Sequence, residues 1–328
     1  MRRFLVKRLL YCIPVLFGIS LLTFLLFRVV GGDPVDRLAG KYARAEQKEQ
    51  LREQLGFNLP LWPRPELLLA GDLGNFADNQ LFHHLFDTFT FRFGRSQQYH
   101  RRISAMILSG LVPSLSLTLP AFLLGLFLQT ALALLSASRR GSRFDRLLTL
   151  ACLVGMSFPF LALIIFGQSL LAGRFGWFPI LGFPEKFGLG VLTHTALPVL
   201  LGLVAGLGGG VRFYRTILIE EAESDYVRTA RAKGLKESRV LFGHVLKNAM
   251  IPIITRTVVV IPFLFLGSLL LERFFSIPGL GYMLVDAVNS SDWPVINALT
   301  FVGAVFYLGA VVLTDVLYAL VDPRVSLK

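Results

Sequence analysis

The sequence predicts an all-α membrane protein with six transmembrane helices, and three observations support this prediction. Hydrophobic residues make up 54% of the 328 residues, and the mean hydropathy is +0.63. Charged residues account for 16% of the chain, below the roughly 25% that is usual in soluble domains. Lys and Arg gather in short segments beside long apolar runs, as the positive-inside rule expects. We therefore interpret residues 1–328 as a single membrane domain.

The first apolar run extends from Leu9 to Val30 and follows the basic residues of the segment 2–8. At about 1.5 Å per residue this run is long enough to cross a bilayer. A signal peptide would have a shorter apolar core and a small-residue cleavage site. The run is therefore predicted to be an uncleaved first span with a cytoplasmic N-terminus.

Residues 31–109 are predicted to form an extracytoplasmic insert, because no apolar run in them is long enough to cross. A charged helix is expected from Lys41 to Leu55, and the many aromatic residues that follow indicate a folded segment. His83, His84 and His100 do not have the spacing of metal ligands, so they are interpreted as surface or packing residues. No metal site is predicted.

Five further spans follow, at about Leu111–Ser136, Leu147–Ala172, Ala196–Val211, Pro252–Leu271 and Val295–Leu320. The basic turn Arg139–Arg146 assigns the junction of the second and third spans to the cytoplasmic side. Six spans place both termini in the cytoplasm. The formal charge of +12 is explained by these flanking segments, so no nucleic-acid partner is predicted.

Residues 212–251 form a polar segment inside this apolar sequence. A helix is predicted from Glu220 to Lys233, with acidic residues in its first turns and basic residues in its last, which suits the helix dipole. Gly234 follows, the residue type that closes a helix with a positive φ. A second helix is predicted from Ser238 until Pro252 ends it. The segment is too short and polar to span a bilayer, so it is expected on the membrane surface or against a partner.

The run Asp225–Leu235, closed by Asn248–Pro252, resembles the cytoplasmic loop of ABC-importer permeases of the dipeptide, oligopeptide and nickel type. Residues 272–281 and the C-terminal run 322–324 resemble the same family. The resemblance implies a type I ABC-importer permease fold in the inner membrane of a bacterium or archaeon. An amphipathic helix pair on the surface of another kind of membrane protein is the alternative interpretation.

In that family the helix–glycine–helix element couples the permease to an ATPase. The resemblance implies that Leu235 is exposed at the tip and enters a groove of the partner, inside a polar rim. The site residues it implies are Arg228, Thr229, Ala230, Lys233, Gly234, Leu235 and Glu237. The implied partners are a related second permease, two ABC ATPase subunits, an extracytoplasmic substrate-binding protein and membrane lipid.

No catalytic constellation is present, and no phosphate-binding G-x-x-x-x-G-K-[ST] loop, so neither an enzyme nor a cofactor is predicted. Arg256 and Asp315 are ionisable residues within predicted spans, where such residues are functional candidates. A structural pair between the two is favoured over a substrate site.

Three functional classes follow from these observations. The coupling loop favours an ABC-importer permease. A secondary transporter or channel would be expected to show internal repeats or buried ion ligands, and an intramembrane enzyme would need converging polar side chains within the spans. In ABC importers an external binding protein selects the cargo, so the permease sequence identifies none.

Overall fold

The computed structural model describes residues 2–30, 35, 39, 44–69, 72–184 and 188–321. Each regular element in this part of the chain is a helix, which confirms the predicted all-α class. Contacts divide the chain into unit 1, Met1–Leu108 with Asp286–Leu308, and unit 2, Ser109–Val285 with Gly309–Lys328. A single membrane domain over 1–328, with an insert at 31–109 and a cytoplasmic loop at 212–251, stays a prediction.

Among the described residues, five helices are long and apolar enough to cross a membrane. They are Val6–Val29, Ile103–Ser138, Leu189–Ala222, Glu237–Phe275 and Trp293–Val316. A sixth candidate is a bent pair, Arg143–Ser157 with Phe160–Arg174. The number of candidate spans is therefore six, as predicted, when the bent pair is counted as one span.

The third predicted span is bent rather than straight. It consists of two helices that meet at an angle of 92°. The proline ring of Pro159 disfavours helical backbone at the residue before it. Phe158 is accordingly extended, with φ −80° and ψ 126°. Pro159 then forms the N-cap of α9 (Phe160–Gly167), which continues into the π-helix η2 (Gln168–Arg174).

Unit 1 contains α1 (Arg2–Phe24), η1 (Leu25–Val30), α3 (Ala45–Leu55), α4 (Pro65–Leu69), α5 (Leu73–Ala77) and α6 (Gln80–Phe89), with parts of α7 (Ile103–Ser138), α15 (Leu280–Ser290) and α16 (Trp293–Val321). The charged helix predicted from Lys41 to Leu55 corresponds to α3, which begins at Ala45 after the extended Arg44, while 41–43 lie outside the described residues. Gly56 ends α3 in the left-handed conformation (φ +69°). The N-cap of α6 is Asn79, whose side chain accepts a hydrogen bond from the backbone N–H of Phe82 at 3.0 Å.

Aromatic side chains hold unit 1 together, which explains why the aromatic-rich segment is folded. Phe24 of α1 is fully buried, and its ring lies 5.7 Å from Trp62 and 5.5 Å from the imidazole of His84. On α16 (Trp293–Val321), Phe301 is also buried and packs against three rings, Phe89, Phe91 and Phe93, at 5.5, 5.8 and 6.4 Å. These contacts join residues more than 200 positions apart in the sequence.

His84 makes the stability of unit 1 depend on pH. Its Nε2 lies 3.1 Å from the carbonyl oxygen of Ser20, and burial lowers its pKa from 6.5 to about 4. The unfolded chain therefore binds a proton more tightly, and stability falls as the pH drops from about 6.5 to about 4. Thermal unfolding measured at pH 7 and at pH 4.5 should show a smaller loss of stability at the lower pH in His84→Gln than in the native protein. Equal acid losses in the two proteins would contradict this role.

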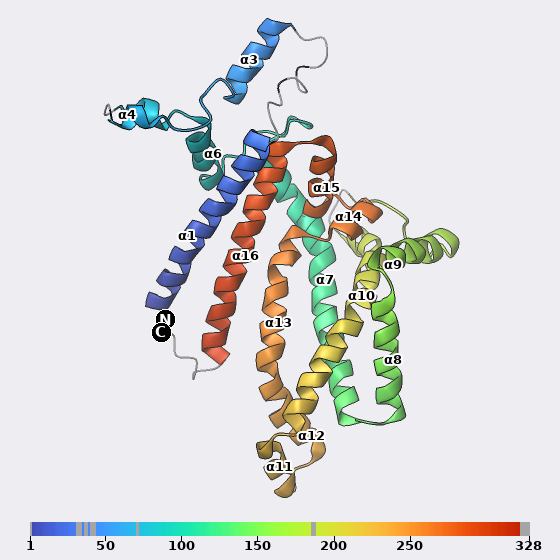
Figure 1. Ribbon diagram of the computed structural model, residues 1–328. Helices are drawn as coiled ribbons and strands as arrows, with labels where there is room; N and C mark the ends of the chain where they lie inside the picture. The colour runs from blue at the N-terminus through green and yellow to red at the C-terminus, as the bar shows by residue number, and fades with distance from the viewer. Residues whose placement is uncertain are drawn as a thin grey trace. The chain divides into compact units, whose positions relative to one another are not determined.

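Unit 2 contains most of α7 (Ile103–Ser138), α8 (Arg143–Ser157), α9, η2, α10 (Leu189–Ala222), α11 (Asp225–Ala232), α12 (Glu237–Val240), η3 (Leu241–Leu246), α13 (Lys247–Leu266) and α14 (Leu269–Phe275), with part of α15 (Leu280–Ser290). The long helix α10 packs against α8, α9 and α13. The short helices α11 and α12 lie at the same end of unit 2 as the turn between α7 and α8 (Figure 1). That end carries the predicted coupling residues.

Two predicted helix boundaries in this region were wrong. The helix predicted from Glu220 to Lys233 is interrupted, since α10 ends at Ala222 and α11 begins at Asp225 after the N-cap Ser224. Pro252 does not end the second helix, because α13 continues through it to Leu266. A single proline frees few backbone groups, and a helix in an apolar protein tolerates it when neighbouring groups satisfy them.

A buried carboxylate organises the segment after α13. Glu272 has no exposed surface, and its oxygens accept hydrogen bonds from the Ser114 hydroxyl at 2.8 Å and from the backbone N–H of Tyr282 at 2.9 Å. A Cβ on Gly281 would lie 3.0 Å from Glu272 Oε2, and one on Gly279 would overlap the same carboxylate. The glycines of residues 272–281 are therefore needed for close approach to Glu272.

Candidate coupling site and membrane cavity

The coupling segment, residues 225–240, consists of α11 and α12 joined by a glycine turn. Gly234 has φ +76°, which confirms the predicted left-handed closure of the first helix. Its backbone N–H donates to the carbonyl oxygen of Arg231 at 2.9 Å, and the N–H of Leu235 donates to that of Ala230 at 3.4 Å. These bonds satisfy carbonyl groups that the end of α11 would otherwise leave unpaired.

Leu235 is not exposed at the tip, so this part of the prediction was wrong. Its side chain is half-buried and packs on a core that includes Val227 and Val240. An apolar residue after a closing glycine commonly packs back on the helix it follows. The same core reaches Tyr214 and Leu218 of α10. The coupling segment is therefore packed onto the membrane helices through its own apolar side chains.

The other predicted site residues are mostly exposed. Thr229, Lys233 and Gly234 are exposed, as is Arg228, whose side chain is 71% accessible, while Ala230 is buried in the core. The sequence interpretation missed Phe242 of η3, which is 62% exposed beside α12. The sequence signal that could have identified Phe242 is its position as an apolar residue on the outer side of a short amphipathic helix. The exposed surface therefore combines polar groups with the large aromatic ring of Phe242.

An ion pair spans the glycine turn. Arg231 Nη2 lies 2.8 Å from Glu237 Oε1, and Arg231 Nη1 donates to the carbonyl oxygen of Ala222 at 3.3 Å. Glu237 raises the pKa of Arg231 through this hydrogen bond. Arg231 thereby connects α11 to both α12 and the end of α10. These contacts orient the coupling segment on α10.

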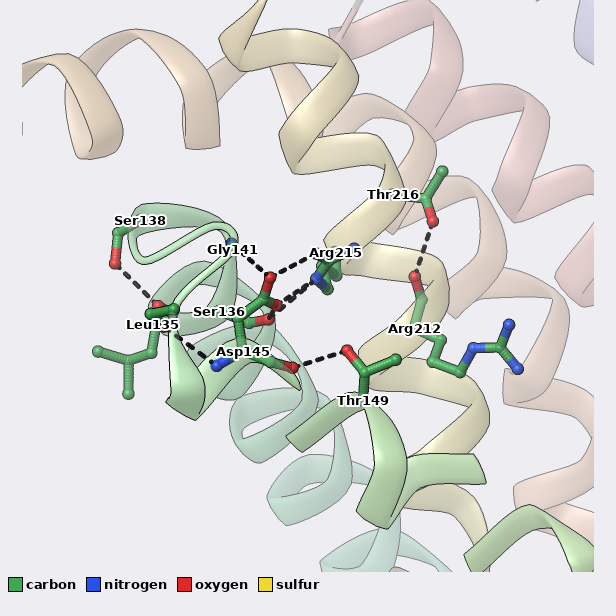
Figure 2. Close-up of polar contacts among 10 residues, drawn as sticks. Leu135, Ser136, Ser138, Gly141, Asp145, Thr149, Arg212, Arg215 and Thr216 are labelled. Carbon is green, nitrogen blue, oxygen red and sulfur yellow. Dashed lines mark hydrogen bonds and ion pairs between the residues drawn. The ribbon is translucent and has the colours of Figure 1, made fainter. Parts of the chain in front are cut away.

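The turn between α7 and α8 is attached to α10 by a buried ion pair (Figure 2). Arg215 Nε lies 2.7 Å from Asp145 Oδ1, and Arg215 Nη2 lies 2.7 Å from Asp145 Oδ2. The carboxylate also accepts hydrogen bonds from the Ser136 hydroxyl and from the backbone N–H of Gly141. The Asp145 side chain is only 5% exposed. Two parallel N–H···O bonds fix both distance and orientation, so α7, α8 and α10 are held together two turns before the end of α10.

A second, exposed ion pair lies further along α10. Arg140 in the α7–α8 turn pairs with Glu223, the C-cap of α10, and both side chains are more than half exposed. Arg140 lowers the pKa of Glu223 through their hydrogen bond. The basic turn therefore contacts α10 at two levels, and the deeper contact, Asp145–Arg215, is the shielded one.

Unit 2 also contains a cavity of about 420 Å³ between its membrane helices. Its walls come from α7, α9, α10, α13 and α14, and α10 contributes Gly202, Gly206 and Gly210 at intervals of one helical turn. Gln129 and Tyr214 are among its polar lining residues, and Arg256 is its one charged residue among those described. Glycine at these positions lets other lining side chains approach α10 closely, because a Cβ on Gly210 would overlap the Gln129 amide.

Arg256 lies at one wall of the cavity, with its guanidinium 4.2 Å from the ring centre of Phe213. Such a contact stabilises a cation in an apolar setting. Asp315 is half-buried on α16, and its pairing with Arg256 stays a prediction.

An all-α chain with five or six candidate spans, a cavity among them and a packed two-helix loop at one end has the features of a membrane transport subunit. Two family models match it: binding-protein-dependent transport system inner membrane component over residues 129–327, and the N-terminal region of such membrane components over residues 1–118. The chain belongs to this family. It is therefore a multi-pass inner membrane component of a binding-protein-dependent transport system.

Similar curated proteins cover the whole chain. The oligopeptide transport system permease protein AppB of Bacillus subtilis (strain 168) is 33% identical over 330 residues, 99% of this chain and 100% of that protein. The glutathione transport system permease protein GsiC of Escherichia coli (strain K12) is 33% identical over 328 residues, 100% of both chains. GsiC of Shigella flexneri serotype 5b (strain 8401) is similar to the same extent.

Proposed function

We propose that this permease forms half of the translocation pathway of an ATP-driven importer and works with a related second permease, two ABC ATPase subunits and an extracytoplasmic substrate-binding protein. AppB and GsiC are permeases of oligopeptide and glutathione transport systems, which supports peptides or similar small solutes as the cargo of this chain. The chain itself carries out no catalysis, and ATP is hydrolysed by the partner.

The exposed surface of the coupling segment and of the adjoining η3 is the observation that carries the proposal. Exposed Arg228 and Lys233 provide a polar rim, and exposed Phe242 provides an apolar anchor, the combination found at protein interfaces. We propose Phe242 as the anchor, because Leu235 is packed inward. A Walker-motif ATPase should co-purify with the native chain and less with Phe242→Ser. A chain that transports without any such ATPase would instead be a secondary transporter or channel, the alternative function.

The cavity of unit 2 is proposed as this chain's share of the pathway. A Cβ on Gly206 would meet no atom closer than Gln129 Nε2 at 3.8 Å, so a larger residue can extend into the cavity without a backbone shift. Gly206→Leu is therefore expected to lower transport severely while ATPase co-purification is retained. Gly209→Leu is the matched control, since a Cβ there has no neighbour within 4 Å and Gly209 does not line the cavity. Equal transport by the two variants would exclude this cavity from the pathway.

The topology proposed with this function has both termini in the cytoplasm. Single-cysteine labelling from either side of the membrane should find the segments 2–8, 139–146, 212–247 and 324–328 inside and 41–98 outside. This expectation follows from the distribution of basic residues. Labelling of 41–98 from the cytoplasmic side would contradict the six-span topology.

A further inference from the structure

Unit 1 contains a second cavity of about 420 Å³, formed by η1, the segment after α3, α6 and the start of α16. Its volume falls within the range of about 300–1,000 Å³ typical of small-molecule sites. Aromatic rings form part of its wall, including Phe57 and Trp293. The cavity shares no lining residue with the membrane cavity of unit 2.

Charged groups of both signs line this cavity. Arg28 and Arg92 supply the cations, and Glu53 and Asp87 supply the anions. Arg28 is held by its contact with the Phe57 ring at 3.8 Å and by a hydrogen bond of 3.3 Å to Gln80 Oε1. Its position is therefore preorganised.

Two of the charged groups lack a direct opposite charge. Among the described residues, the carboxylate of Asp87 and the guanidinium of Arg92 form no ion pair with each other or with a third residue. Burial raises the pKa of Asp87, and the nearby His83 and Arg92 partly offset this. Asp87 and Arg92 are both exposed, so both are accessible to a ligand, and a carboxylate at this position attracts a cationic group.

A buried acceptor on α16 adds an independent observation. Asn297 Oδ1 is buried without a hydrogen-bond partner, and Asn297 lines the cavity. Its Nδ2 is 3.5 Å from the hydroxyl oxygen of Thr88, at the limit of hydrogen bonding. A buried acceptor without a partner costs about 1–3 kcal/mol, so a ligand N–H that reaches it would be favoured.

The charges of the cavity discriminate among ligand classes. A simple anion such as phosphate would be attracted by Arg92 and repelled by Asp87 and Glu53. A metal cation would be repelled by the two arginines. In addition, the described residues contain no group of three or more His, Cys, Asp and Glu side chains that could hold a metal ion. A ligand with separate positive and negative ends satisfies both sets of groups, because each end can approach the opposite charge.

We propose that the unit 1 cavity binds a small zwitterion of the amino acid or short peptide class, with its carboxylate at Arg92 and its ammonium at Asp87 and Asn297 Oδ1. Trp293 and Phe57 contact the apolar part of the ligand. This site goes beyond the proposed function, because it lies outside the membrane cavity and does not require ATP hydrolysis.

The test uses the full-length chain with its partner subunits in lipid nanodiscs, without the binding protein. Trialanine is the probe, and its N-acetyl and C-amide derivatives each remove one charge. Binding is measured by equilibrium dialysis and by Trp293 fluorescence in a Trp62→Phe/Trp177→Phe background, which leaves one of the three tryptophans. Trialanine should bind at least about tenfold more tightly than either derivative, as expected for the loss of one charge-assisted hydrogen bond.

The variants assign each end of the ligand. Arg92→Gln should weaken trialanine binding at least about tenfold and abolish the preference over the C-amide alone. Asp87→Asn should abolish the preference over the N-acetyl form alone. Arg101→Gln, an exposed arginine of the same unit outside the cavity, should bind as the native chain does. ATPase co-purification and basal hydrolysis show that each variant assembles.

Binding that is equal for trialanine and its doubly blocked derivative, or that is unchanged in Arg92→Gln and Asp87→Asn, would overturn the proposal. So would the absence of trialanine binding to an assembled native complex. These outcomes leave the proposed importer function intact, because that function is tested by ATPase co-purification and transport. If Arg92→Gln does not assemble, Arg92→Lys should retain binding, and a loss of binding by an assembled Arg92→Lys complex would also overturn the proposal.

Discussion

Arg215→Ala is expected to lower the stability of unit 2 by about 3 kcal/mol, because it leaves the Asp145 carboxylate buried without its cation. The carboxylate is 5% exposed and the guanidinium 24% exposed, so the effect should lie at the lower end of the range for buried pairs. The remaining hydrogen bonds from Ser136 and Gly141 do not neutralise the charge. Equilibrium unfolding in mixed micelles measures the change.

Three matched variants separate this effect from a general sensitivity of the α7–α8 turn. Arg215→Lys keeps the charge but loses the two-point geometry and should fall between the native chain and Arg215→Ala. The double variant Asp145→Leu/Arg215→Met removes both charges and should recover much of the stability. Arg140→Ala breaks only the exposed pair with Glu223, so it should cost less than about 1 kcal/mol. If the Arg215→Ala protein were as stable as Arg140→Ala, the buried ion pair would not stabilise unit 2 more than the exposed pair does.

The position of Arg215 on α10 links the buried ion pair to the coupling segment. Arg215 lies two turns before the end of α10, and the coupling segment continues from that end. If the pair is lost, α10 is no longer fixed to the α7–α8 turn at this level. Limited proteolysis within residues 225–240 should therefore be faster in Arg215→Ala than in Arg140→Ala.

The sequence predicts those features of the fold that depend on local physics. Long apolar runs predict the candidate spans, because a helix in lipid must satisfy its own backbone and present apolar side chains. Gly234 predicts a left-handed helix end for an equally local reason. The bend at Phe158–Pro159 also has a local cause. The apolar run continues through Pro159, however, so the hydropathy pattern predicts one unbroken span there.

The remaining features depend on contacts that sequence spacing does not reveal. Asp145 and Arg215 are separated by 70 positions, and Ser114 and Glu272 by 158. The direction of Leu235 is decided by a core that includes α7 and α10, so its burial follows from tertiary packing. The unit 1 cavity likewise combines residues 27–97 with residues 293–297.

Gly234→Val is expected to reduce transport about tenfold or more while membrane insertion is unchanged. A Cβ at Gly234 would meet no atom within 4 Å, and the residue has φ +76°, so the substitution acts through backbone conformation alone. A left-handed conformation costs an ordinary L-residue about 1–2 kcal/mol, and a β-branched residue resists it more strongly. A shift of 1.4 kcal/mol is a factor of ten in the population of the native turn.

The strain can be relieved only by a different turn, and that turn would withdraw Leu235 from its core and separate Arg231 from Glu237. The exposed surface around Phe242 would then no longer be held in one orientation for the proposed ATPase partner. Gly234→Asn should be nearly neutral, because asparagine tolerates the left-handed region. Gly243→Val is the matched control, since Gly243 also has no neighbour within 4 Å and does not have a positive φ. Transport and transport-stimulated ATP hydrolysis in reconstituted vesicles should therefore fall in Gly234→Val and persist in the other two variants. A Gly234→Val complex that assembles and transports at the native rate would show that residues 225–240 do not couple the permease to its ATPase.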